Sequence, residues 1–163
     1  MAKTEQLQIR VTASEKAQIK ARARQANEDV SSWVLRQLIP PAEERFQALC
    51  GVLATSPTPP SDRFAEINDF LTGLSATSLV QAVGLAPRAD LGSFEANYLA
   101  AMIEQTCVTK TAEVPAWLTG IEPLPNPWFA SSLISRRLRL LTRSPPAFRR
   151  RNLFTDNHVG ERG

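Results

Sequence analysis

Few side chains in this 163-residue sequence have the type and spacing that acid–base or nucleophilic chemistry requires. Glu66 and Asp69 would share one face of a helix, but carboxylates three residues apart are more typical of a solvated surface than of a catalytic pair. Cys107 has no candidate base except His158, the only histidine, which lies far along the chain. The seven glycines never have the spacing of a phosphate-binding loop. We therefore predict that the protein is not an enzyme and has no catalytic residues.

The cysteines do not fit the common metal sites. Cys50 and Cys107 are far apart and match no metal-ligand spacing, so we expect no metal and no cofactor. Two buried or half-buried thiols in a reducing cytoplasm are the simpler interpretation. No apolar run is long enough to span a bilayer, and Met1 to Lys3 are not followed by the core of a signal peptide. These features predict a cytoplasmic protein without a membrane partner.

Charge is distributed unevenly along the chain, whose formal net charge is +3. Residues 1–40 carry seven Lys/Arg against four Asp/Glu, residues 41–135 four against ten, and residues 136–163 eight against two. Basic ends therefore flank an acidic middle. A basic N-terminal unit suits a phosphate backbone, and dimerisation would double its charge.

An unbroken alternation of polar and apolar residues runs from Gln6 to Thr12. Because successive side chains of a strand point to opposite faces, this segment predicts a strand with one apolar and one polar face. The apolar face consists of Leu7, Ile9 and Val11, and the polar face of Gln6, Gln8 and Arg10. A lone strand of this length is not stable, so we expect it to pair with a second copy of the chain.

Two helix signals follow the strand. Thr12 to Glu15 form a capping-box sequence, which predicts a helix from there to about Gln25 or Ala26. Asn27 is suited to the left-handed conformation that often ends a helix. Ser31 and Ser32 then offer N-cap side chains for a second helix that continues to Ile39, where Pro40-Pro41 stops it.

One strand followed by two capped helices, from about Thr4 to Leu38, resembles the ribbon-helix-helix family of MetJ/Arc type. The resemblance implies a homodimer in which the strands of two chains pair antiparallel and enter the major groove of double-stranded DNA. Gln can make two hydrogen bonds with adenine and Arg can make two with guanine. The resemblance therefore assigns base reading to the polar face of the strand, which is Gln6, Gln8 and Arg10.

The same resemblance implies contacts with the DNA backbone, at the start of the second helix and from nearby lysines. The residues concerned are Ser31, Ser32, Lys16 and Lys20. The sequence departs from the family at Asn27, where glycine is common, and at the acidic pair Glu28-Asp29 beside the expected phosphate contact. The alternative is that the segment is purely structural, as a short strand before a helix is in many α+β domains.

The rest of the chain predicts helices and no further strand. A helix from Ala42 to Ala54 could extend the dimer core or begin a second domain. Thr55 to Ser61 contains three prolines and predicts a linker between a domain at 1–54 and another at 62–163. The fold class is therefore mainly α, with a ribbon-helix-helix unit followed by an all-α C-terminal domain. Its helices are expected at 63–74, 77–83, 93–108 and 133–141.

Aromatic and basic residues in the C-terminal domain are candidates for binding a partner protein. Trp117, Trp128 and Phe129 are either core aromatics or an exposed anchor. The run Arg149-Arg150-Arg151 has three interpretations: a solvated basic turn, a surface for a partner protein, or a second contact with nucleic acid. The residues selected for a partner surface are Trp128, Phe129, Arg149, Arg150 and Arg151.

Residues 90–163 also resemble an uncharacterised bacterial domain, through Val114-Pro115-Ala116-Trp117, Pro127-Trp128-Phe129, Ser144 to Phe154 and Val159-Gly160. That domain occurs in small proteins, some of them encoded beside toxins of nucleotidyltransferase type. Together the resemblances imply an antitoxin that represses its own operon through an operator and neutralises a protein toxin. Two alternatives stay open: a relaxosome accessory or plasmid-partition protein, and an interaction module whose N-terminal segment only dimerises.

Overall fold

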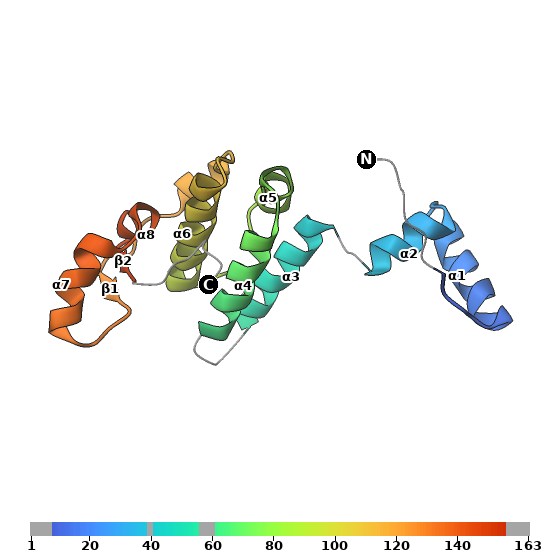
Figure 1. Ribbon diagram of the computed structural model, residues 1–163, viewed down its shortest axis with the longest axis horizontal. Coiled ribbons are helices and arrows are strands. Elements are labelled where there is room, and N and C mark those ends of the chain that lie inside the picture. Colours follow the sequence, from blue (N-terminus) through green and yellow to red (C-terminus); the bar gives the residue numbers. More distant parts are fainter. Residues whose placement is uncertain (1–7, 39–40, 56–60, 156–163) are drawn as a thin grey trace. The chain divides into compact units, whose positions relative to one another are not determined.

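The computed structural model describes residues 8–38, 41–55 and 61–155 (Figure 1). The chain divides into two compact units, Met1–Pro41 and Ala42–Gly163, which are described separately below. In the described ranges, no helix combines the length and apolarity that crossing a bilayer requires.

The first unit contains two helices, α1 (Ala13–Gln25) and α2 (Val30–Leu38), which pack on each other. Both were predicted, and Asn27 has the expected left-handed conformation, with a φ of 56°. Ala23 is the buried residue of α1. Residues 8–12 belong to no strand within the single chain, so the ribbon predicted over Gln6 to Thr12 is not seen, and Gln6 and Leu7 lie outside the described residues.

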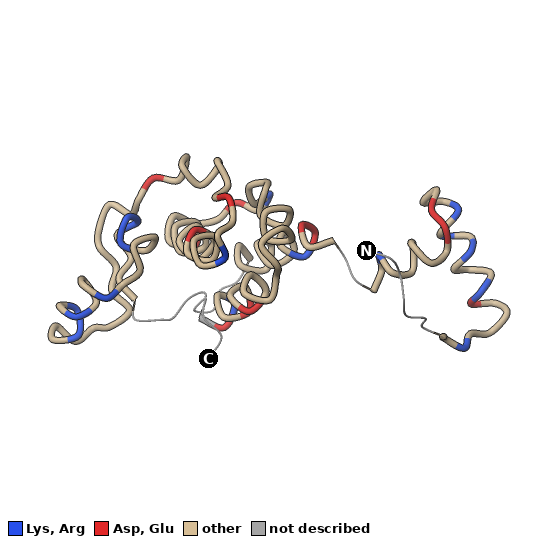
Figure 2. The backbone as a smooth tube through the Cα atoms, turned by 45° about the horizontal axis from the view of Figure 1, so that its top comes forward, with Lys and Arg blue, Asp and Glu red and all other residues tan. Residues whose placement is uncertain are grey.

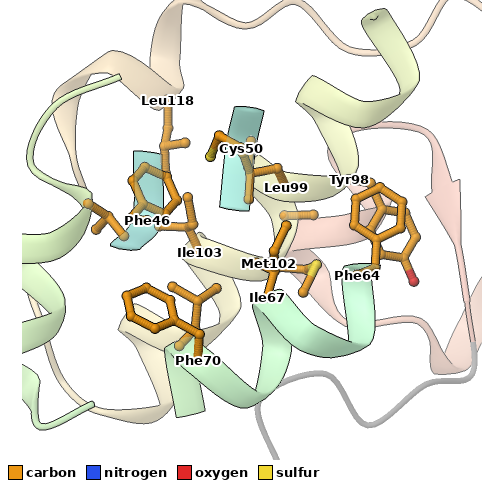
Figure 3. Close-up of a cluster of buried hydrophobic side chains, with 14 of the residues drawn as sticks. Phe46, Cys50, Phe64, Ile67, Phe70, Tyr98, Leu99, Met102, Ile103 and Leu118 are labelled. Carbon is orange, nitrogen blue, oxygen red and sulfur yellow. The ribbon is translucent and has the colours of Figure 1, made fainter. Parts of the chain in front are cut away.

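The second unit is built around α6 (Ser93–Thr109). From Asn97 to Cys107 every residue of α6 is buried except Gln105, which is half-buried. Because the buried residues of α6 lie on all sides of the helix, neighbouring elements must cover all of its sides. Helices α3 (Ala42–Thr55), α4 (Ser61–Gly73) and α5 (Ala76–Val83) supply much of the surrounding core, including Leu79. Figure 3 shows Phe46 of α3 and Ile67 of α4 in this core.

Helix α3 belongs to the second unit. It packs against α4 and α5, and its side chains Phe46 and Cys50 have no exposed surface. The sequence placed the domain boundary at residues 55–61 and left two roles open for this helix. The compact units instead divide between Pro41 and Ala42, because the apolar face of α3 is buried by α4 and α5. Burial raises the pKa of the Cys50 thiol to about 12, so this cysteine remains protonated near neutral pH.

The C-terminal part of the second unit has short elements. They are a 3₁₀ turn η1 (Ala116–Gly120), β1 (Trp128–Phe129), α7 (Ile134–Arg143), α8 (Pro146–Arg149) and β2 (Leu153–Phe154). The two strands pair in parallel, with Trp128 opposite Leu153. The prediction of a mainly helical protein is confirmed, while the expectation that this half has no strand is corrected by this two-residue pair. The left-handed Asn152, with a φ of 58°, turns the chain so that its carbonyl accepts from Trp128 N–H at 2.8 Å.

Candidate nucleic-acid interface

The start of α1 is fixed by the predicted capping box. The backbone N–H of Thr12 donates to Glu15 Oε2 at 2.7 Å, and the N–H of Glu15 donates to Thr12 Oγ1 at 3.3 Å. The hydrogen bond from the Thr12 backbone, and then the one from its hydroxyl, lower the pKa of the Glu15 carboxyl. This reciprocal cap sets the residue at which the extended segment ends, and so sets the position of Arg10 relative to the helix.

The extended segment exposes apolar side chains. Ile9 is 60% exposed and Val11 is 44% exposed. Together with Ile19, Val30 and Val34 they line a hollow of about 670 Å³ in the first unit. Large apolar side chains around an open hollow are typical of a surface that a partner covers.

Basic residues surround the same hollow. Arg10, Lys16 and Lys20 line it, and all three are exposed. Within the described ranges, none of them has an ion pair with an acidic residue. The structure therefore brings three predicted DNA-contacting residues together beside an apolar surface. Of the remaining predicted base readers, Gln8 is exposed and Gln6 lies outside the described residues.

The start of α2 differs from the prediction. The helix begins at Val30, and the Asp29 carboxylate accepts from Ser32 N–H at 3.1 Å. Asp29 is therefore the capping residue, and Ser31 and Ser32 lie in the first turn. Asp is as good an N-cap as Ser, and its charge also interacts favourably with the helix dipole. The Ser32 N–H, which was assigned to a DNA phosphate, is already used by a carboxylate.

The other loop acid is also paired inside the first unit. Glu28 Oε2 lies 3.3 Å from Arg36 Nε, in the last turn of α2. This ion pair links the turn to the end of the helix and offsets part of the acidic charge that the sequence places there. Of the pair Glu28-Asp29, Asp29 is the acid that is bonded to the Ser32 N–H, where the phosphate contact was expected.

The predicted aromatic anchors of the C-terminal part are packing residues. The Trp128 ring lies 5.0 Å from that of Phe94, measured between centroids, and Trp128 packs against the buried core. Phe129 stacks on Phe154 at 4.8 Å, and the Arg137 guanidinium lies 5.3 Å from the centre of the Phe129 ring. Trp128 and Phe129 are half-buried, and these contacts connect the short parallel pair to α6 and α7.

The three adjacent arginines do not form one surface. Arg151 is only 7% exposed and donates to the carbonyl of Leu118 at 3.1 Å. Burial lowers the pKa of its guanidinium, while the nearby Glu104 raises it. Arg150 is exposed and lies 2.9 Å from Glu104 Oε1. The prediction of a basic run facing a partner is thus corrected for Arg151, and Arg149 remains exposed.

Glu104 is the residue that the sequence analysis missed. It lies within the buried stretch of α6 and faces both Arg150 and Arg151, the second at 3.8 Å. An acid inside an otherwise apolar run is a signal for a buried ion pair, because an isolated buried charge is costly. In the described residues, no group of His, Cys, Asp and Glu side chains could hold a metal ion.

Comparison with known proteins concerns the first unit. Residues 1–39 match the NikA-like family model, which is described as mobilization protein NikA. No curated protein and no solved structure matches the chain. The family match ends before α3, so the resemblance of residues 90–163 to a toxin-associated domain receives no support from it.

Proposed function

We propose that this protein is a DNA-binding accessory protein of plasmid mobilization, which acts as a homodimer at an origin of transfer. The observation that carries the proposal is the family match over residues 1–39, which covers the same segment as the capping box, the two helices and the exposed basic side chains. Among the functions considered from the sequence, this is the relaxosome alternative.

A dimer follows from the exposed apolar side chains of the first unit. Ile9 and Val11 alternate with polar residues, and a strand of this pattern needs a partner strand. Pairing with the same segment of a second chain would cover both apolar side chains. Hydrogen bonds between the two strands would then form the ribbon that the sequence predicts.

DNA contact follows from the polar side of the same segment. In a paired strand, Gln8 and Arg10 would project together from the face opposite Ile9. Their side chains can each make two hydrogen bonds with a base edge in the major groove. Lys16 and Lys20 lie one helical turn apart on α1 and are available to backbone phosphates.

The proposal is tested by mapping where the purified protein binds on the replicon that carries its gene. Fragments of that DNA are selected by the protein, and the bound fragments are footprinted. A footprint on an inverted repeat next to a relaxase gene is the expected result. A footprint confined to the promoter of the protein's own operon, with a neighbouring toxin retained by the protein, supports the antitoxin interpretation instead.

The antitoxin interpretation is therefore the competing outcome of this experiment. It predicts repression of the operon and a toxin partner for the second unit. The comparisons with known proteins support neither of these. The third alternative, an interaction module that only dimerises, predicts that no fragment is selected above background. Each of the three interpretations gives a different footprinting result.

A further inference from the structure

Helix α7 presents two opposite stripes of side chains. Arg136, Arg139 and Arg143 recur at the spacing of one helix face and are all exposed. Successive residues of an α-helix are about 100° apart, so these arginines lie opposite the apolar residues of the helix. The apolar stripe is also exposed, and it comprises Ile134 at 77%, Leu138 at 67% and Leu141 at 42%.

Among the residues that the structure describes, no acidic side chain pairs with the arginine stripe. The sequence has no acidic residue between Glu122 and Asp156. Within residues 8–38, 41–55 and 61–155, none of the three arginines has an ion pair. Figure 2 shows basic segments along α7 and no acidic one within it. An exposed row of cations without counter-charges is the electrostatic footprint of a polyanion site.

The helix packs on β2 along one side. Leu140 is only 3% exposed, and its carbonyl accepts from both the N–H and the hydroxyl of Ser144, at 3.0 and 2.7 Å. Arg137 lies outside the stripe, and its side chain contacts neighbouring residues of the second unit. Its Nε donates to the Ser131 carbonyl at 3.2 Å, and its guanidinium lies over Phe129. The stripe is therefore carried by a helix that is packed against the second unit along one side.

We propose that Arg136, Arg139 and Arg143 contact the phosphate backbone of duplex DNA, as a second DNA-binding surface beyond the first unit. The choice of DNA as the occupant rests on the proposed function, which makes DNA the ligand of the same chain. Guanidinium groups suit this task because they bind phosphate oxygens through two parallel hydrogen bonds. These contacts carry no base specificity and add affinity to any sequence.

Two other occupants fit the stripe less well. A second copy of α7 would pack through the apolar stripe and leave both arginine rows facing solvent, so self-association does not account for the arginines. A membrane would take up the apolar stripe with Leu138 at its centre, which would turn the arginines on the opposite face away from the lipid headgroups. The two stripes lie on opposite faces, so substitutions can separate these cases within one helix.

The test measures binding of the full chain to a mixed-sequence duplex by fluorescence anisotropy over a range of salt concentrations. The variant Arg136→Gln/Arg139→Gln/Arg143→Gln should reduce the slope of log K against log salt. The slope should fall by roughly 0.9 for each phosphate contact that is lost. With three arginines replaced, the fall is up to roughly 2.7 per chain. The matched control Ile134→Gln/Leu138→Gln should leave the slope unchanged, and circular dichroism checks that both variants keep their helices.

A triple variant with the wild-type slope overturns the inference while the proposed function stands. An Arg10→Ala variant separates the opposite case. If Arg10→Ala leaves the affinity for every DNA unchanged while the triple variant loses DNA binding, the proposed function fails. The proposal that the arginine stripe contacts DNA then still stands. Vesicles of phosphatidylglycerol and phosphatidylcholine form the last arm. Two results together would overturn the proposal and assign α7 to a membrane surface. The wild-type protein would bind these vesicles and Leu138→Glu would not, and the triple variant would keep the wild-type salt slope for DNA.

Discussion

The Asp29 carboxylate accepts a hydrogen bond from the backbone N–H of Ser32 at 3.1 Å, at the position where a DNA phosphate was expected. One negative group therefore already occupies the start of α2. A phosphate that approached the same N–H would meet a carboxylate and would have to displace it. We therefore expect the Asp29 carboxylate to weaken the binding of a DNA backbone phosphate at this position.

Replacing Asp29 with asparagine should strengthen DNA binding. Asn is as good an N-cap as Asp, so the helix start is kept while the charge is removed. Two exposed like charges about 4 Å apart repel each other by about 1 kcal/mol in water, which predicts a gain of up to roughly fivefold in affinity for all sequences. Anisotropy titrations on specific and mixed-sequence duplexes measure it. Weaker binding by the variant, with unchanged helix content, would show that Asp29 helps the DNA contact instead.

Placing a charge in the apolar strand face should abolish dimerisation. The change Ile9→Asp would bury an unpaired carboxylate between two strands, which is strongly unfavourable. We expect the full-length variant to sediment as a monomer while the second unit keeps its helical signal. The exposed control Gln8→Asp changes the opposite face and should leave the sedimentation coefficient unchanged. A dimeric Ile9→Asp protein would place the dimer interface elsewhere.

Removing the carboxylate of Glu104 should destabilise the second unit. Glu104→Gln leaves the buried Arg151 without its counter-charge, and breaking a buried pair costs about 3–5 kcal/mol. The long separation of 3.8 Å puts the expected loss at the lower end of that range. Urea unfolding followed by circular dichroism measures it. The control Arg150→Gln removes an exposed partner and should cost about 1 kcal/mol or less. Equal losses in both variants would contradict the buried role of Arg151.

Local features of the fold could be predicted from the sequence because their signals lie within a few residues. Thr12 and Glu15 are three residues apart, and Asn27 takes its left-handed conformation within a short turn. The cap of α2 was misplaced by two residues because Asp29, Ser31 and Ser32 are all good caps. Which of them becomes the N-cap depends on the backbone conformation of the turn before the helix, and residue propensity alone does not determine that conformation.

Contacts between distant residues could not be predicted in the same way. Glu104 and Arg151 meet because α6 and α8 pack together, and no local pattern connects them. The parallel pair of Trp128 with Leu153 likewise requires the intervening helix α7 to return the chain. For the same reason, the burial of Arg151 could not be predicted from the basic run Arg149-Arg150-Arg151, because its partners Glu104 and Leu118 are distant in the sequence.

Arg10 provides the most direct test of sequence-specific DNA binding through the extended segment. Affinities of the wild-type protein and of Arg10→Ala are compared by anisotropy on the footprinted site and on a shuffled duplex of the same length, with Lys20→Ala as the control. We predict that Arg10→Ala loses roughly 1–3 kcal/mol on the site alone, with relaxed preference at one base pair, while Lys20→Ala weakens both duplexes equally. An Arg10→Ala protein with unchanged affinity and unchanged sequence preference would contradict the account.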